Sequence, residues 1–206
     1  MTAEALRIVR FAAIGLIGVL AFVWLGVGLG YLQSERPVSK EGEAFGNSMI
    51  VPFQLIDQTA KPVSERDVLG KPSALFFGFT YCPDVCPTTL ASLSAMLGQM
   101  GPDADRLGVF LVTVDPERDT PEVLKQYLSA FDKRIRGLTG SPAQIELLTK
   151  ALGVYAARVN LDGGGYTMDH TASVFLLDAQ GRFRGTIAYG EEREVAVAKL
   201  KKLLER

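Results

Sequence analysis

The sequence has few of the side chains that usually carry chemistry or crosslink a chain. Its 206 residues include two cysteines and one histidine, and the cysteines lie close together, at positions 82 and 86. A single pair so close together does not form a disulfide framework. A domain of this size buries an adequate core without a disulfide, so structural need does not explain the pair. The cysteines therefore point to local chemistry.

An excess of charge of one sign is also lacking. The chain has 22 Lys and Arg against 23 Asp and Glu, a formal net charge of -1, and both signs are mixed along it. This balance gives no electrostatic footprint for a polyanion and disfavours nucleic-acid binding. Hydrophobic residues make up 48% of the chain, which fits one globular domain plus a smaller segment rather than a disordered protein.

Charged residues are missing from residues 11–32, which form one apolar run. A helix needs about 20 residues to cross a bilayer, so the run predicts a transmembrane anchor. A cleaved secretory signal is the alternative, but the run exceeds the usual apolar core of a signal, and no small-x-small cleavage pattern follows it cleanly. The expected organisation is a short N-terminus at residues 1–10, the anchor, a polar tether at 33–48 and a folded domain at 49–206.

The charges beside the anchor predict its orientation. Arg7 and Arg10 precede it, which places the N-terminus in the cytoplasm, although Arg36 and Lys40 follow it and weaken this bias. Nothing at the N-terminus resembles an Arg- and Ser-rich transit peptide, which favours a bacterial inner membrane over an organelle. We therefore expect a single-pass inner-membrane protein whose domain faces the periplasm.

The domain shows alternating strand and helix patterns, without internal repeats. Continuous apolar runs are typical of strands buried on both faces, and Ser/Thr-Pro pairs are typical of helix starts. Such alternation predicts an α/β fold in which helices cover both faces of a mixed sheet. The expected strands are residues 51–56, 73–79, 107–114, 154–159, 173–178 and 182–189, and the expected helices start at Pro87, Pro121, Pro142 and Glu191.

Cys82 and Cys86 lie where a buried strand gives way to a helix. We expect Pro87 at the first helical position and Cys86 as the N-cap, since a residue before proline avoids the α region. The positive end of the helix is expected to lower the pKa of both thiols and favour thiolates. Three intervening residues allow the sulfurs to bond each other or share a metal, and the spacing alone does not choose. Two inert, buried cysteines are the remaining alternative.

His170 is the sole histidine and stands just before an apolar strand. Two thiolates with a distant imidazole would suit a soft ion such as Cu(I). A hydrogen-bonded structural histidine or an exposed one is the competing interpretation. The position before a sheet strand favours a site, because open α/β sites form at that level of the sheet.

Three segments resemble the Sco/SenC family of copper metallochaperones: GFTYCPDVCPTTL, VDPERDTPEVLKQYLSAF and DHTASVFLLD, in this order. The resemblance runs from about residue 51 to the C-terminus. It implies a thioredoxin-like fold behind a single N-terminal anchor. It also implies that Cys82, Cys86 and His170 bind copper, as Cu(I), Cu(II) or both, and that the copper goes to the binuclear site of a cytochrome c oxidase subunit.

A thiol–disulfide oxidoreductase is the alternative function. Cys82 and Cys86 would then be a redox pair that reduces client cysteines, and His170 would not be needed. Outside the cytoplasm the pair tends to oxidise, so either function calls for a thioredoxin-like reductant, and other copper carriers are further expected partners. Whether the chain is an enzyme stays open. A peroxiredoxin is disfavoured, because Phe79 stands where that chemistry needs a threonine.

Four further residues are candidates for supporting roles. Asp115 and Asp119 follow a strand and are either ordinary turn and cap residues or carboxylates near the thiols. Asp84, between the cysteines, would repel an anion or contact a client. Met168 is either an auxiliary thioether ligand or a packing residue. Glycines at 163–165 are expected to let the loop bearing His170 move.

Overall fold

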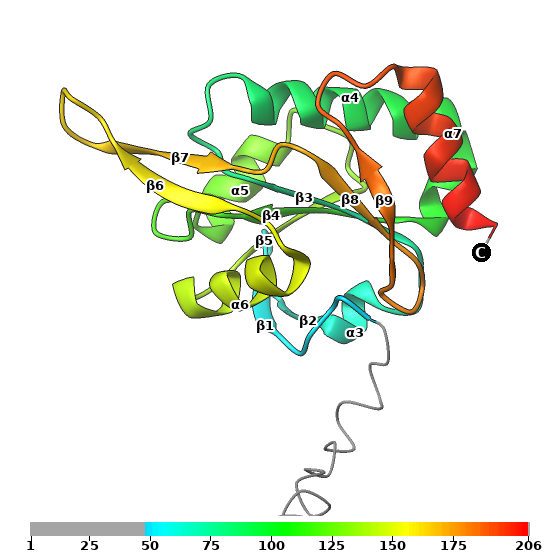
Figure 1. The fold of residues 1–206 in the computed structure, drawn as a ribbon, viewed down its shortest axis with the longest axis horizontal. Helices are drawn as coiled ribbons and strands as arrows, with labels where there is room; N and C mark the ends of the chain where they lie inside the picture. The colour runs from blue at the N-terminus through cyan, green and yellow to red at the C-terminus, as the bar shows by residue number, and fades with distance from the viewer. Residues whose placement is uncertain (1–47, 206) are drawn as a thin grey trace, which may run out of the picture. The chain divides into compact units, whose positions relative to one another are not determined.

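The structure is a computed structural model that describes residues 48–205 (Figure 1). The predicted cytoplasmic N-terminus, the anchor and all of the tether except Ser48 lie outside these residues, so those predictions stay predictions. Between residues 48 and 205, no helix has the length and apolar character needed to cross a membrane.

Seven strands form the main sheet, in the order β2-β1-β5-β4-β3-β8-β9. The three strands β3, β4 and β5 run parallel, whereas β1, β2, β8 and β9 pair antiparallel with their neighbours. The predicted mixed sheet is therefore confirmed. The strands are β1 Gln54–Asp57, β2 Pro62–Ser64, β3 Ser73–Gly78, β4 Gly108–Thr113, β5 Ile135–Thr139, β8 Val174–Leu177 and β9 Phe183–Ile187.

Strands β3 and β4 form the centre of the sheet because their sequences are apolar at nearly every position. Every residue of both strands is buried, as expected for parallel strands covered on two faces. They pair in register from Ser73 opposite Gly108 to Gly78 opposite Thr113. The carboxyl end of β3 therefore delivers the chain directly to the cysteine-bearing loop.

Helices cover both sides of this sheet. In the view of Figure 1, α4 and α7 pack against each other above the sheet, and α6 lies below it. Thr120 and Ser141 cap α5 and α6 as predicted, each followed by proline at the start of the helix. The helices are α3 Glu65–Val68, α4 Val85–Met100, the 3₁₀ turn η1 Gly101–Arg106, α5 Pro121–Leu128, α6 Pro142–Leu152 and α7 Arg193–Leu204.

The start of α4 differs from the prediction. The N-cap is Asp84, and Cys86 lies inside the first turn rather than at the cap. Pro87 occupies the third helical position, which is tolerated because the first N–H groups of a helix have no intrahelical acceptor for proline to remove. Helix α7 likewise begins two residues later than expected, at Arg193, because Glu191 accepts a hydrogen bond from the Ala188 backbone and closes the preceding turn.

A separate two-stranded hairpin projects from the body of the domain (Figure 1). It consists of β6 Ala156–Asn160 and β7 Tyr166–His170, which pair only with each other among the described strands. The sequence predicted β6, within residues 154–159, but not β7. The residues of β7 are mostly polar and none is fully buried, so they lack the apolar pattern of a sheet strand. His170 is the last residue of this hairpin.

Candidate metal centre

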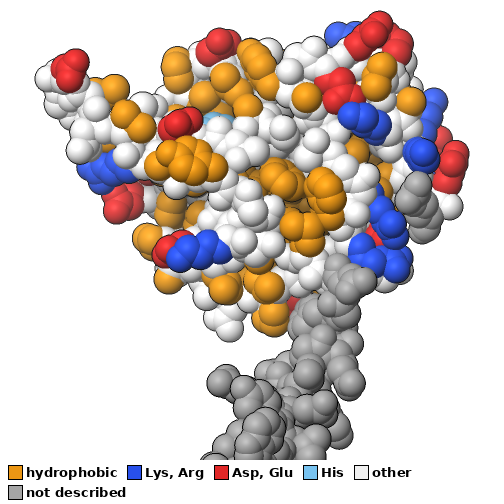
Figure 2. Space-filling view, in the orientation of Figure 1, with side chains coloured by type: hydrophobic (Ala, Val, Ile, Leu, Met, Phe, Trp, Pro, Cys, Tyr) orange, Lys and Arg blue, Asp and Glu red, His pale blue; other side chains and the backbone are white. Residues whose placement is uncertain are grey.

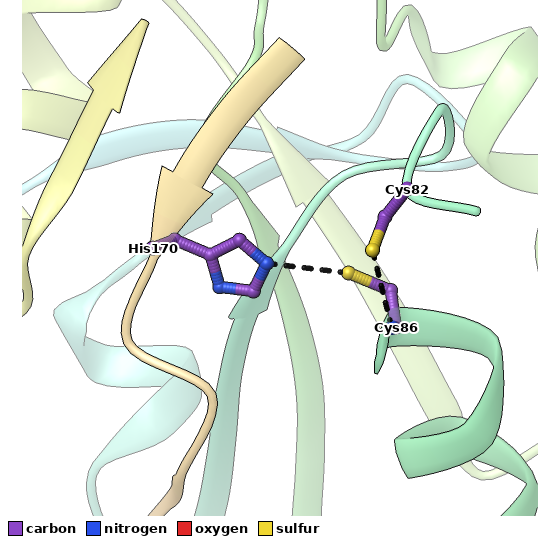
Figure 3. Close-up of side chains that lie close together, drawn as sticks. All are labelled: Cys82, Cys86 and His170. Atoms are coloured by element: carbon purple, nitrogen blue, oxygen red, sulfur yellow. Dashed lines mark hydrogen bonds between the residues drawn. The ribbon is translucent and has the colours of Figure 1, made fainter. Parts of the chain in front are cut away.

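Cys82, Cys86 and His170 come together at one end of the sheet (Figure 3). Their ligand atoms all lie within 4.8 Å of one another. Cys82 belongs to the loop after β3, Cys86 to the first turn of α4, and His170 to the end of β7. The structure therefore brings together all three of the residues that the sequence proposed as ligands.

The cysteines are arranged around the N-terminus of α4. The Cys86 backbone N–H donates to Cys82 Sγ at 3.3 Å (Figure 3). The sulfur thus satisfies one of the unpaired N–H groups of the first turn, while the Asp84 side chain makes no such capping bond. Cys82 is partly exposed and Cys86 is buried, so solvent and a partner would reach Cys82 first.

The protonation of Cys86 differs from the prediction for a helix N-terminus. Burial raises the pKa of the Cys86 thiol far above its ordinary value, and the nearby Cys82 and Asp119 act in the same direction. A hydrogen bond with the Phe79 backbone opposes them. Desolvation raises the pKa more than the helix N-terminus lowers it, because this sulfur is fully covered by the core. Cys86 is therefore a neutral thiol, which would have to lose its proton to bind a metal.

The Cys86 sulfur occupies space that a glycine leaves open. A Cβ at Gly78 would lie 2.9 Å from Cys86 Sγ and 3.0 Å from the ring of Phe76. Any other residue at the end of β3 would therefore press on the sulfur. Sequence reasoning missed this role, since a glycine at a strand end has many possible causes.

His170 is prepared as a nitrogen ligand. Its Nδ1 lies 3.1 Å from the Thr171 carbonyl oxygen, which can only accept, so Nδ1 carries the proton and Nε2 is unprotonated. Nε2 accepts a hydrogen bond from the neutral Cys86 thiol, with Sγ at 3.4 Å (Figure 3). Burial lowers the pKa of His170, against weaker opposite effects of the Thr171 carbonyl and Asp169. A neutral imidazole with an unprotonated Nε2 is the form that binds metals.

Asp119 supports the loop that carries Cys82. Its fully buried carboxylate accepts hydrogen bonds from the Thr80 hydroxyl at 2.6 Å, the Thr80 backbone and the Thr113 hydroxyl at 2.6 Å. Burial raises the pKa of Asp119, and these hydrogen bonds work against that increase. Asp119 also acts to raise the pKa of Cys86, which agrees with the alternative that places a carboxylate near the thiols.

The other candidate residues do not join the three ligands. Asp115 binds Arg118 and Tyr166, a contact that the sequence did not reveal. Asp84 is exposed and accepts from the Thr88 hydroxyl at 3.3 Å. Met168 packs against the hydrophobic core, which agrees with the packing alternative.

Comparison with known proteins gives consistent matches. The family model described as SCO1/SenC matches residues 41–205. A putative copper-binding protein of Stutzerimonas stutzeri is 40% identical over 136 residues, which cover 66% of this chain and 67% of the relative. A SCO2-like protein of Rickettsia felis is 37% identical over 169 residues, which cover 77% of this chain and 82% of the relative.

Solved structures give the same answer for the fold. The structure of Bradyrhizobium japonicum ScoI with copper bound aligns with a TM-score of 0.71 at 47% identity. The alignment covers 75% of this chain and 99% of that chain. The predicted α/β, thioredoxin-like fold is therefore confirmed for the described residues.

Proposed function

The chain belongs to the SCO1/SenC family, and from this membership we propose that it is a copper metallochaperone. In this proposal Cys82, Cys86 and His170 hold the copper, and the cargo is delivered to the binuclear copper site of a cytochrome c oxidase subunit. The relative from Stutzerimonas stutzeri is named as copper-binding, and the Bradyrhizobium japonicum structure contains copper.

One observation carries the proposal: two sulfurs and an unprotonated imidazole nitrogen lie within 4.8 Å of one another. Thiolates are the soft ligands that select Cu(I), and imidazole also suits Cu(II). The donor set therefore fits copper in either oxidation state. Cys82 and His170 are partly exposed, whereas Cys86 is buried, so a client would take over the cargo from the side of Cys82 and His170.

We place the domain, residues 49–206, on the periplasmic face of a bacterial inner membrane, held by an anchor at residues 11–32. The support for this placement is the uncharged apolar run and the arginines before it. Oxidising surroundings would join Cys82 to Cys86 and remove both thiolates. The proposal therefore includes a thioredoxin-like reductant as partner.

A thiol–disulfide oxidoreductase is the second candidate, favoured by the closeness of the two sulfurs. In that reaction the Cys82 thiolate attacks a client disulfide, and one client cysteine leaves as a thiolate. The Cys86 thiolate then attacks the mixed disulfide, releasing the second client thiolate and leaving a Cys82–Cys86 disulfide. The raised pKa of the Cys86 thiol slows this second attack, which favours copper binding as the main function.

The test compares copper binding and client reduction on the same full chain in detergent. We expect one copper per reduced chain, and loss of binding in Cys82→Ser and Cys86→Ser. In cells, neither variant should support oxidase assembly. Copper binding unaffected by both substitutions would refute the metal site. Efficient client reduction by a wild-type chain that binds no copper would establish the second candidate instead.

A further inference from the structure

An arginine outside the three candidate ligands lies against Tyr166, beside the turn of the hairpin that carries His170. The Arg118 guanidinium is 3.8 Å from the centre of the Tyr166 ring and 4.7 Å from that of Tyr81. Tyr166 begins β7, and Tyr81 directly precedes Cys82. Arg118 is thus packed between the histidine-bearing strand and the cysteine-bearing loop.

Hydrogen bonds fix this arrangement. Arg118 Nη1 donates to the Tyr166 carbonyl at 3.0 Å, and its Nε pairs with the Asp115 carboxylate. The Tyr166 hydroxyl donates to the same carboxylate at 2.8 Å. Asp115 is almost fully buried, at 3% exposure, where charge-assisted hydrogen bonds are strong. Asp115, Arg118 and Tyr166 therefore form a closed set, named here the arginine latch.

The latch continues into the support of the thiol loop. The Asp115 backbone N–H donates to the Thr113 hydroxyl at 2.9 Å, and that hydroxyl donates to Asp119. Asp119 in turn holds Thr80, two residues before Cys82. One network of hydrogen bonds therefore joins the start of β7 to the loop that bears Cys82.

The hairpin needs such a support. Strands β6 and β7 pair only with each other among the described strands, and an isolated two-stranded hairpin is at best marginally stable in water. Its base is closed by hydrogen bonds between Tyr155 and Thr171. Tyr166 lies at the turn end of β7, about 13 Å along the strand from His170, so a hairpin released there would swing about its base and tilt the backbone that directs the His170 side chain.

From these contacts we propose that Arg118 is a positioning residue for His170: by latching Tyr166, it holds the imidazole at the thiols. The inference rests on the proposed copper function and adds a residue that touches no ligand atom. The Tyr166 ring also lies 3.7 Å from the Arg158 guanidinium. Arg158 is more exposed, however, at 54% against 22% for Arg118, and its ion pair is with exposed Glu117, so Arg118 is the less exposed of the two arginines beside the ring.

The test uses the full chain and the fact that it contains one histidine. With ¹⁵N-labelled histidine, the apo-protein gives one set of ring signals, free of background. In the wild type we expect the Nδ1–H tautomer, as the contact with the Thr171 carbonyl requires. In Arg118→Ala we expect the imidazole to average between its two tautomers and its pKa to move towards that of an exposed histidine. Copper affinity should fall about 10- to 100-fold, as for other groups that orient ligands, and nitrogen coupling should weaken in the Cu(II) EPR spectrum.

Arg134→Ala is the matched control. Its side chain is 23% exposed against 22% for Arg118, and it also pairs with a carboxylate, that of Asp132, away from the site. A loss of general stability would affect both variants, whereas the imidazole signals should change only in Arg118→Ala. Arg118→Lys keeps the positive charge beside Asp115 but not the planar stack, so it should regain stability without restoring the wild-type signals.

Two outcomes separate this inference from the function on which it rests. Unchanged imidazole signals and copper affinity in Arg118→Ala would overturn the latch while leaving the copper site intact. A wild-type chain that binds no copper would refute the proposed function, and the ring signals of the apo-protein would still decide whether Arg118 positions His170. Wild-type signals in Arg118→Lys would overturn the role of the stack.

Discussion

Gly78→Ala should damage the candidate copper site through a single added methyl group. The new Cβ would lie 2.9 Å from Cys86 Sγ, 3.0 Å from Phe76 Cε1 and 3.4 Å from Leu111 Cδ1. Real Cβ contacts are almost never below 3.0 Å, so at least the sulfur must move. Cys86 has one side-chain torsion and is surrounded by core, so its sulfur has no free space to enter.

Two quantities should change together in this variant. Overpacking a core of this kind costs about 1–3 kcal/mol of unfolding free energy. In the wild type the sulfur lies 3.4 Å from His170 Nε2. Its displacement in the variant would separate it from the other two candidate ligand atoms. We expect Cu(I) affinity to fall by about 10-fold or more, as for other changes just outside a metal site.

Gly98→Ala provides the control, because Gly98 lies within α4 and a Cβ there meets nothing within 4 Å. Replacing an unhindered helical glycine should raise the unfolding free energy by about 0.5–1 kcal/mol and leave copper binding unchanged. Urea unfolding and competition titration with a Cu(I) chelator measure both effects. If Gly78→Ala matched Gly98→Ala in both assays, the argument that Gly78 makes room for the sulfur would be wrong.

Three more substitutions test separate features. His170→Ala should weaken copper binding, most of all for Cu(II), and leave the dithiol reduction potential largely unchanged. If the variant bound Cu(I) and Cu(II) as tightly as the wild type does, His170 would be structural. Tyr127→Phe removes a buried hydroxyl that has no partner among residues 48–205 and should leave stability in urea unchanged or raise it by up to about 1 kcal/mol; a clear loss would reveal a missed partner. Burial alone would raise the pKa of Asp178, but hydrogen bonds from Arg182 and Arg184 bring it below its ordinary value. The stabilisation that the Asp178 carboxylate gives is present above the unfolded pKa of about 3.9 and is lost as the pH falls through the lower folded value. Asp178→Asn should therefore lower the unfolding free energy at pH 7, and on acidification the variant should lose less unfolding free energy than the wild type.

The central fold could be predicted from the sequence because its signals are local. Residues 73–79 and 107–114 are nearly continuous apolar runs, and these became the buried parallel strands β3 and β4. The Thr120-Pro121 and Ser141-Pro142 pairs predicted helix starts, and α5 and α6 begin there in the structure. Strand β7 escaped prediction because its residues, YTMDH, are mostly polar and only partly buried, with Met168 alone packed against the core.

The three candidate ligands could be chosen from the scarcity of their residue types, and the structure brings them together, whereas their environment could not be predicted. The helix start beside Cys86 is a local feature and suggests a lowered pKa of the thiol, but the side chains that cover the sulfur come from core residues distant in the sequence. Their effect on the pKa is opposite and larger. Such burial also bears on function. A buried neutral thiol is a poor attacking group in disulfide exchange, because the thiolate is the nucleophile. A metal ion can displace the thiol proton as it binds, so a raised pKa does not block metal binding in the same way. The packing around Cys86 therefore favours holding copper over fast redox turnover.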